Sequence, residues 1–314
     1  GLIARIATFQ EDTGMPLTLA NFLDYYHIDP RSLYRHGTFS RLCVRADIIE
    51  DFSEPMEETL TKAFPRFAAV DSRRWIQFLL KVLKEDVQHV APLETRMLQM
   101  LQFTIWQKPY EECGFTSLLE GVQAIKACPV LCGELVALLE YNYSRIDFVD
   151  EPVNLGFDCP LDLHCTYTRD QLMIAMDYYQ PKTIQGGVKW LSEKKTDVFF
   201  ITLNKSDKDY SPTTMYNDYS ISDTLFHWQS QSTTGENSPT GKRYIHHKKR
   251  GSQVLLFVRE FKVDHLSNSA APYTYLGKAN YVQHEGSKPM SITWRLERPI
   301  PAKFLKKTSK LVVG

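Results

Sequence analysis

The chain has 314 residues, and its 37 Lys and Arg side chains balance 37 Asp and Glu side chains. This length suggests about two domains, and a hydrophobic content of 43% is sufficient for globular cores. The absence of both a run of about 18 apolar residues and a signal-peptide pattern argues against a membrane protein and favours the cytoplasm. The chain opens with Gly1 rather than Met, so we expect a piece of a longer protein.

The neutral total conceals an asymmetry between the two halves of the chain. Residues 1–160 carry 15 Lys and Arg against 23 Asp and Glu, a balance of −8. Residues 161–314 carry 22 against 14, a balance of +8, and the two halves sum to the 37 and 37 of the whole chain. Basic surfaces attract polyanions, so we expect the second half to bind one.

The first half has the apolar spacing of amphipathic helices. Asp29 is a typical helix cap, and Pro30 suits the first helical position. Residues 71–83 place Trp75 and Leu79 on one apolar stripe. Further helices are predicted at 16–26, 53–64, 90–106, 115–125 and 129–143. Short helices with brief connections are typical of a helical bundle, and we assign residues 1–155 to such a bundle with a linking and docking role.

The second half has the alternating pattern of β-strands. Residues 147–161 lose the helical periodicity and gain proline and glycine, which indicates a domain boundary. Strands are then predicted at 164–168, 188–191, 197–205, 224–231, 253–261, 273–277, 279–286 and 291–297. A capping box at 168–171 begins a helix that continues to Met176. The predicted fold class is α+β and multidomain: an all-α bundle, then a β-rich curved sheet or barrel over 156–314 with one or two helices.

Six scattered cysteines favour reduced thiols over a disulfide scaffold in a chain of this size. Cys128 and Cys132 lie four residues apart in an apolar helical pattern, so we expect both to be buried. Cys159, His164 and Cys165 could form half of a zinc site, but no second half with ligand spacing is evident. We therefore predict no metal site.

The segment 215–232, MYNDYSISDTLFHWQSQS, interleaves aromatic rings with polar side chains. A nucleobase that leaves the duplex is stacked between rings and recognised along its pairing edge, and stacking contributes about 1–3 kcal/mol. Asp218 is the candidate acceptor for the exocyclic amine of cytosine. The predicted base-binding residues are Tyr216, Asp218, Tyr219, Phe226, Trp228, Gln229 and Gln231.

The same segment has an alternative interpretation as ordinary structure. In a strand, Phe226 and Trp228 share one face, while His227 and Gln229 share the other. We expect one face to be core and the other to be the site. Phe226 and Trp228 could therefore be core residues, and His227 could be a structural histidine.

A basic segment, TGKRYIHHKKRG at 240–251, follows and has glycines near both ends. Lys and Arg neutralise phosphates, so this segment predicts a hairpin that holds the DNA backbone beside an extracted base. A solvated basic turn is the alternative. The predicted backbone contacts are Lys242, Arg243, His246, His247, Lys248, Lys249 and Arg250, with Lys288 from a later loop.

No P-loop, HExxH, GxSxG or zinc-deaminase pattern occurs in the sequence. We therefore expect this part of the protein to have no catalytic residues and to need no cofactor of its own.

Residues 160–300 resemble a known family, most specifically through HWQSQ at 227–231 and LFVRE at 256–260. The region is similar to the C-terminal part of the SauUSI-like type IV modification-dependent restriction enzymes. That family joins a phospholipase D-like nuclease, a superfamily 2 helicase and a C-terminal recognition region.

The resemblance implies an SRA-like (PUA-like) domain at 156–314 that flips modified cytosine out of double-stranded DNA. The modified base would be 5-methylcytosine or 5-hydroxymethylcytosine. The partners would be the parent's own helicase and nuclease domains, with ATP and Mg in the helicase motor, and the role would be phage defence.

Two other classes of function stay open. One is a module for non-sequence-specific nucleic-acid or protein interaction, such as a modified-RNA reader or a homodimerisation region. The other is an independent metal hydrolase.

Overall fold

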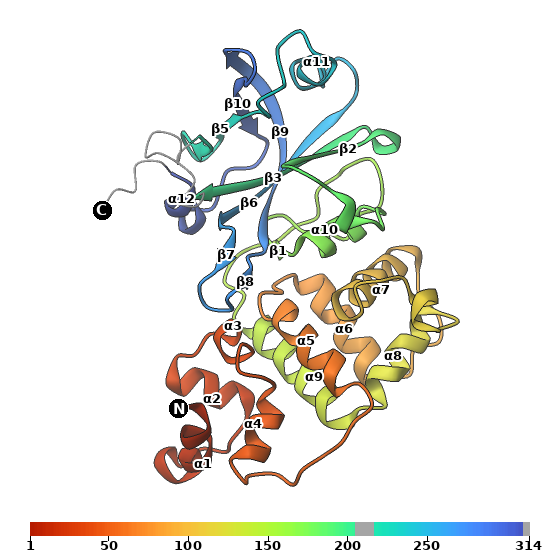
Figure 1. Ribbon diagram of the computed structural model, residues 1–314, viewed down its shortest axis with the longest axis vertical. Helices are drawn as coiled ribbons and strands as arrows, with labels where there is room; N and C mark the ends of the chain where they lie inside the picture. Colours follow the sequence, from red (N-terminus) through yellow and green to blue (C-terminus); the bar gives the residue numbers. More distant parts are fainter. Residues whose placement is uncertain (205–216, 310–314) are drawn as a thin grey trace.

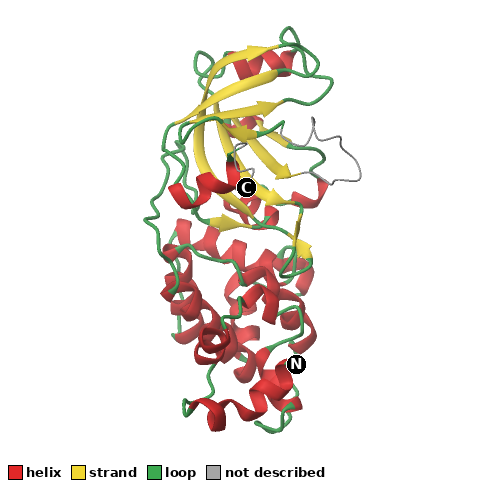
Figure 2. Cartoon of the chain, turned by 90° about the vertical axis from the view of Figure 1, so that its left-hand side faces the viewer, coloured by secondary structure: helices red, strands yellow, loops and turns green. Residues whose placement is uncertain are grey.

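The computed structural model describes residues 1–204 and 217–309. The molecule is elongated, with helices up to Ser144 at one end and a mixed β-sheet at the other (Figures 1 and 2). The α+β prediction is thus confirmed. In the described ranges no single helix is long and apolar enough to cross a membrane. One pair, α8 (Leu118–Lys126) and α9 (Pro129–Ser144), passes that test only as two helices bent by 105°.

The helical unit comprises residues 2–144. Its elements are α1 (Leu2–Thr13), α2 (Leu19–Tyr26), α3 (Pro30–Leu33), α4 (Phe39–Arg45), α5 (Glu57–Phe67), α6 (Arg73–Lys84), α7 (Pro92–Ile105), the 3₁₀ turn η1 (Tyr110–Cys113), α8 (Leu118–Lys126) and α9 (Pro129–Ser144). Local sequence determines where several of these helices begin. Asp29 caps α3 through the Arg31 amide, and Ser72 caps α6 through the Trp75 amide. Such caps each stabilise a helix by about 1 kcal/mol.

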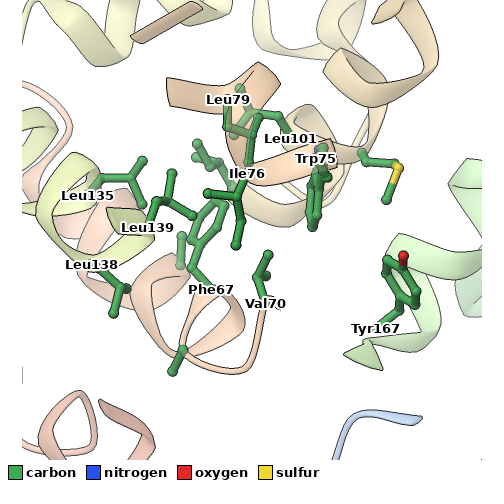
Figure 3. Packing of buried hydrophobic residues seen from close by; sticks show 14 of the residues in the cluster. Phe67, Val70, Trp75, Ile76, Leu79, Leu101, Leu135, Leu138, Leu139 and Tyr167 are labelled. Carbon is green, nitrogen blue, oxygen red and sulfur yellow. The ribbon is translucent and has the colours of Figure 1, made fainter. Parts of the chain in front are cut away.

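The predicted apolar stripe of α6 forms the centre of the helical core. Trp75, Ile76 and Leu79 of α6 are fully buried, and Ile76 lies beside Leu139 of α9 (Figure 3). Burying each of these side chains contributes about 1.5–3 kcal/mol. The same hydrophobic cluster continues to Tyr167 and on to the sheet, so the two units pack through a shared core.

The sheet unit comprises residues 166–308. Its elements are β1 (Thr166–Tyr167), α10 (Arg169–Ala175), η2 (Pro181–Thr183), β2 (Val188–Leu191), η3 (Ser192–Lys194), β3 (Thr196–Asn204), β4 (Tyr219–Ser220), β5 (Leu225–Gln229), α11 (Pro239–Ile245), β6 (Gln253–Phe261), β7 (Val263–Asp264), β8 (Ser269–Ala270), β9 (Tyr273–Glu285), β10 (Ser291–Leu296) and α12 (Ala302–Thr308). The described strand order is β2-β3-β6-β9-β10-β5-β4, with β1 beside β9 and β7–β8 as a separate pair. Among the described strands of the main sheet, β3 and β6 are the only pair that runs in parallel.

This sheet is strongly curved. The ring of Phe199 on β3 lies 4.3 Å from the ring of Trp228 on β5, although three strands separate β3 from β5 in the sheet. In the described residues the end strands β2 and β4 do not pair, so the sheet is open. The curved-sheet prediction is confirmed, and the alternative of a closed barrel is wrong.

The two faces of the curved sheet have different neighbours. The inner face encloses a second hydrophobic cluster with Phe199, Trp228, Trp294 and Tyr244 of α11. The outer face of β3, β6 and β9 packs on α10 and the helical unit through residues such as Phe257. An ion pair of 2.6 Å from Arg31 of α3 to Asp264 of β7 adds a polar contact between the units. The domain boundary at 155/156 stays a prediction, because the cluster of Tyr167 crosses it.

Two local predictions need correction. The two strands predicted at 273–277 and 279–286 form one strand, β9, with an irregularity in its pairing to β6. The basic segment is a helix, α11, followed by a turn, rather than a hairpin. The reason is local: the Ser238 side chain accepts a hydrogen bond from the Gly241 amide, and Pro239 occupies the first helical position. Gly241 is also required, since a Cβ there would lie 2.0 Å from the Gly235 carbonyl oxygen.

Candidate nucleic-acid interface

Strand β5 divides the predicted base-binding residues between the two faces of the sheet. Phe226 and Trp228 point inward, with 0% and 5% of their surface exposed, and belong to the inner core. Leu225, His227 and Gln229 lie on the opposite face and are half-buried. The expected division into one core face and one exposed face is therefore present. Phe226 and Trp228 serve as core, because burial in the inner cluster leaves them no surface for a base.

Two further predicted residues have structural hydrogen bonds. The Asp218 carboxylate, 7% exposed, accepts a 2.8 Å hydrogen bond from the backbone amide of Gln229. This bond connects the residue before β4 to the end of β5. The Gln231 side chain exchanges hydrogen bonds of 3.2 Å with the Tyr244 hydroxyl. Tyr216 lies outside the described residues. Asp218 as the acceptor for cytosine stays a prediction.

The exposed part of the sheet's outer face, on β4, β5, β10 and β9, carries a row of rings and polar groups. We call this exposed part the outer sheet face. Tyr219 of β4 pairs in register with His227 of β5, His227 with Thr293 of β10, and Thr293 with Gln283 of β9. Directly paired residues share a face, so these four side chains form a line across four strands. The rings of Tyr219 and His227 are stacked, with centroids 4.8 Å apart and planes 19° apart.

The orientation of the His227 ring is fixed by its own hydrogen bond. Its Nδ1 lies 2.7 Å from the Asn217 carbonyl oxygen, and a carbonyl can only accept, so Nδ1 carries the proton. In the neutral ring, Nε2 is then an acceptor. The stacked pair thus combines two aromatic rings with an acceptor nitrogen.

A second row extends the outer sheet face toward basic residues. Leu225 pairs with Arg295, and Arg295 pairs with Asn280 of β9. Arg295 is exposed and Asn280 is half-buried. Lys278 lies two residues before Asn280 on the same strand, and both pack outside the inner cluster. The face that carries the stacked rings therefore also carries the positively charged side chains of Arg295 and Lys278.

Most of the predicted backbone contacts are exposed side chains on α11 and the turn after it. Lys242, His246, Lys248, Lys249, Arg250 and the more distant Lys288 are all exposed. Two members of the set have structural partners instead. Arg243 donates two hydrogen bonds of 2.8 Å to the fully buried Asp197 carboxylate and lies over the Trp190 ring.

His247 is the second of these two and is almost fully buried. Its Nε2 accepts a 3.0 Å hydrogen bond from the Tyr281 amide, and its Nδ1 lies 3.3 Å from the Ser252 carbonyl. Burial lowers the pKa of His247, chiefly by desolvation. The ring is therefore neutral and connects the basic turn to β9 rather than offering a charge to phosphate.

The residues considered for zinc form no metal-binding group in the described part of the chain. Cys165 is fully buried, and its thiol lies 3.7 Å from the Asp71 carbonyl oxygen. Burial lowers the pKa of His164 to about 4. Among residues 1–204 and 217–309, no group of three or more His, Cys, Asp and Glu side chains is arranged to hold a metal ion. Cys128 and Cys132 are buried, as predicted.

Cavities do not coincide with the predicted base-binding residues. A cleft of about 980 Å³ lies between the helical unit and β6–β8, and a groove of about 530 Å³ lies beside the basic turn. Neither is lined by Tyr219, Gln229 or another predicted base-binding residue in the described ranges. Among the described residues, the candidate site is therefore a surface outside both cavities.

Sequence reasoning missed Thr293, Arg295 and Gln283 as members of this surface. The segment SITWRLE at 291–297 alternates inner residues such as Trp294 with Thr293 and Arg295, whereas Gln283 lies on β9. This alternation was visible in the sequence. The pairing of β10 with β5 was not, because strand order depends on contacts between residues that are distant in the chain.

Comparison with known proteins covers the sheet unit. Residues 161–307 match a family described as a domain of unknown function (DUF3427). No curated protein matches the chain. The matched region contains the whole outer sheet face, α11 and the basic turn, and excludes the helical unit.

Proposed function

We propose that this chain is the target-recognition region of an ATP-dependent type IV restriction endonuclease. In this proposal residues 156–314 form an SRA-like domain that binds double-stranded DNA containing 5-methylcytosine or 5-hydroxymethylcytosine. The helical unit connects this domain to the parent's helicase and nuclease, where ATP and Mg are used. The chain itself recognises DNA and catalyses no reaction.

One observation carries the proposal: the stacked rings of Tyr219 and His227 share the outer sheet face with the exposed cation Arg295. The Tyr219–His227 pair lies on the outer sheet face, whose second row leads through Arg295 to Asn280. The basic turn is attached to the strand of Asn280 through His247 and the Tyr281 amide. Rings that accept a base and cations that hold the adjacent phosphates are the two components that base extraction requires.

The magnitudes are consistent with such a mechanism. Extracting a base costs a few kcal/mol, whereas stacking on a ring returns about 1–3 kcal/mol. Phosphate contacts from Lys248, Lys249 and Arg250 supply the rest through charge neutralisation. A single methyl group contributes about 1 kcal/mol, so discrimination between modified and unmodified DNA should be modest, at roughly five-fold.

The test compares binding to two duplexes of one sequence, with and without 5-methylcytosine. We expect the modified duplex to bind several-fold more tightly to the 314-residue chain. Tyr219→Ala should remove most of this preference, whereas Tyr25→Ala, at an exposed tyrosine of the helical unit, should leave it unchanged. Equal affinities of the unaltered chain for both duplexes would refute the proposal, and a preference for RNA in competition would favour the RNA-reader alternative.

A further inference from the structure

A groove with four lysines lies beside the connection between the two units. Its cavity measures about 530 Å³. Lys194 and Lys195 come from the turn between β2 and β3, Lys248 from the basic turn, and Lys278 from β9. Lysines from three separate parts of the sequence thus line one concave surface. Of these four lysines, only Lys248 was predicted from the sequence to contact the DNA backbone.

The side chains that line this groove carry a net positive charge. Two carboxylates, Glu193 and Glu297, also line it, so four lysines exceed the acidic groups by two. Within the described ranges none of the four lysines forms an ion pair with a carboxylate. Lys194 lies 5.6 Å from the Phe157 ring. Positive charges without carboxylate partners favour an external anion.

One wall of the groove is the segment 155–157, which follows the helical unit in the chain. Hydrogen bonds hold this wall in place: the Gln253 side chain donates to the Leu155 carbonyl at 2.9 Å and to the Thr196 hydroxyl at 3.0 Å. The backbone amide of Gln253 also donates to the Lys195 carbonyl at 2.9 Å. The groove is therefore built before any ligand arrives.

We infer that this groove binds the phosphodiester backbone of DNA, as a second contact beside the outer sheet face. The inference rests on the proposed function for the identity of the polyanion. The groove and the face share β9, because Lys278 and Asn280 line the groove and Asn280 pairs with Arg295. A strand of DNA on the outer sheet face can continue along β9 into the groove, where its phosphates would touch the wall that joins the two units.

The test removes two groove cations that the sequence did not single out. Lys195→Gln with Lys278→Gln keeps the side-chain stems and removes two charges. We expect affinity for modified and unmodified duplex to fall equally, by about five-fold per lysine at low salt, and the slope of log affinity against log salt to decrease by about 1 per lysine. Glu193→Gln with Glu297→Gln should act in the opposite direction and raise affinity for both duplexes.

The matched control is Lys62→Gln with Lys81→Gln, which removes two exposed lysines from the helical unit and should change neither quantity. If the Lys195→Gln, Lys278→Gln variant has the same salt slope as the unaltered chain, the groove does not bind DNA. Recognition of modified cytosine would be unaffected by that result. A reduced slope in a chain that never discriminates the two duplexes would support the groove and refute only the modified-base proposal.

Discussion

The Arg243–Asp197 ion pair gives the sharpest test of how the basic segment is used. Arg243→Met keeps the apolar stem over Trp190 and removes the charge. The Asp197 carboxylate would lose two 2.8 Å hydrogen bonds while remaining fully buried. Leaving a buried charge without its partner costs about 3–5 kcal/mol, a large fraction of the roughly 5–15 kcal/mol that stabilises a typical domain.

Urea denaturation followed by circular dichroism measures this loss. Lys242→Met, at the exposed neighbour on the same helix, is the control and should change the free energy of unfolding by less than about 0.5 kcal/mol. Adding Asp197→Asn to Arg243→Met should restore much of the stability, since no unpaired charge remains. If Arg243→Met unfolds at the same urea concentration as Lys242→Met but binds DNA weakly, Arg243 is a phosphate contact and the structural role is wrong.

Three other predictions follow from buried polar groups. Asp218→Ala should cost about 1–3 kcal/mol of stability by leaving the Gln229 amide unpaired, whereas Asp218→Asn keeps an acceptor and should cost less; equal urea midpoints for the two variants would contradict this. Burial raises the pKa of Asp71 to about 7. The contribution of Asp71 to stability is therefore complete below the unfolded pKa of about 4 and is lost as pH rises to about 7. Asp71→Asn should unfold at higher temperature than the unaltered chain at about pH 8, but not at about pH 4. Burial lowers the pKa of His164 to about 4, so stability should fall as pH drops from about 6.5 toward 4, and a His164→Gln variant with the same loss would exclude this histidine as the cause.

Elements that depend on local pattern could be predicted from the sequence. The stripe of Trp75 and Leu79, the Asp29 cap and the alternation of Phe226 with His227 all depend on neighbours within a few residues. The structure places each of them in the expected helix or strand. The fold class followed from these elements.

Partners distant in sequence could not be predicted. Phe226 and Trp228 became core because curvature brings Phe199 over them, and Arg243 acquired its buried partner because α11 lies against β3. Helix α11 itself was missed, since the charges and glycines of 240–251 obscured the Ser238 cap just before it. The lysine groove depends on three separate segments meeting, which no local pattern indicates.

The most direct test is a crystal structure of this chain with a duplex that contains one 5-methylcytosine. We expect the modified base outside the helix, against the Tyr219–His227 rings, with backbone phosphates at Lys248 and Lys249. A duplex whose bases are all stacked and paired, bound away from β4 and β5, would contradict it.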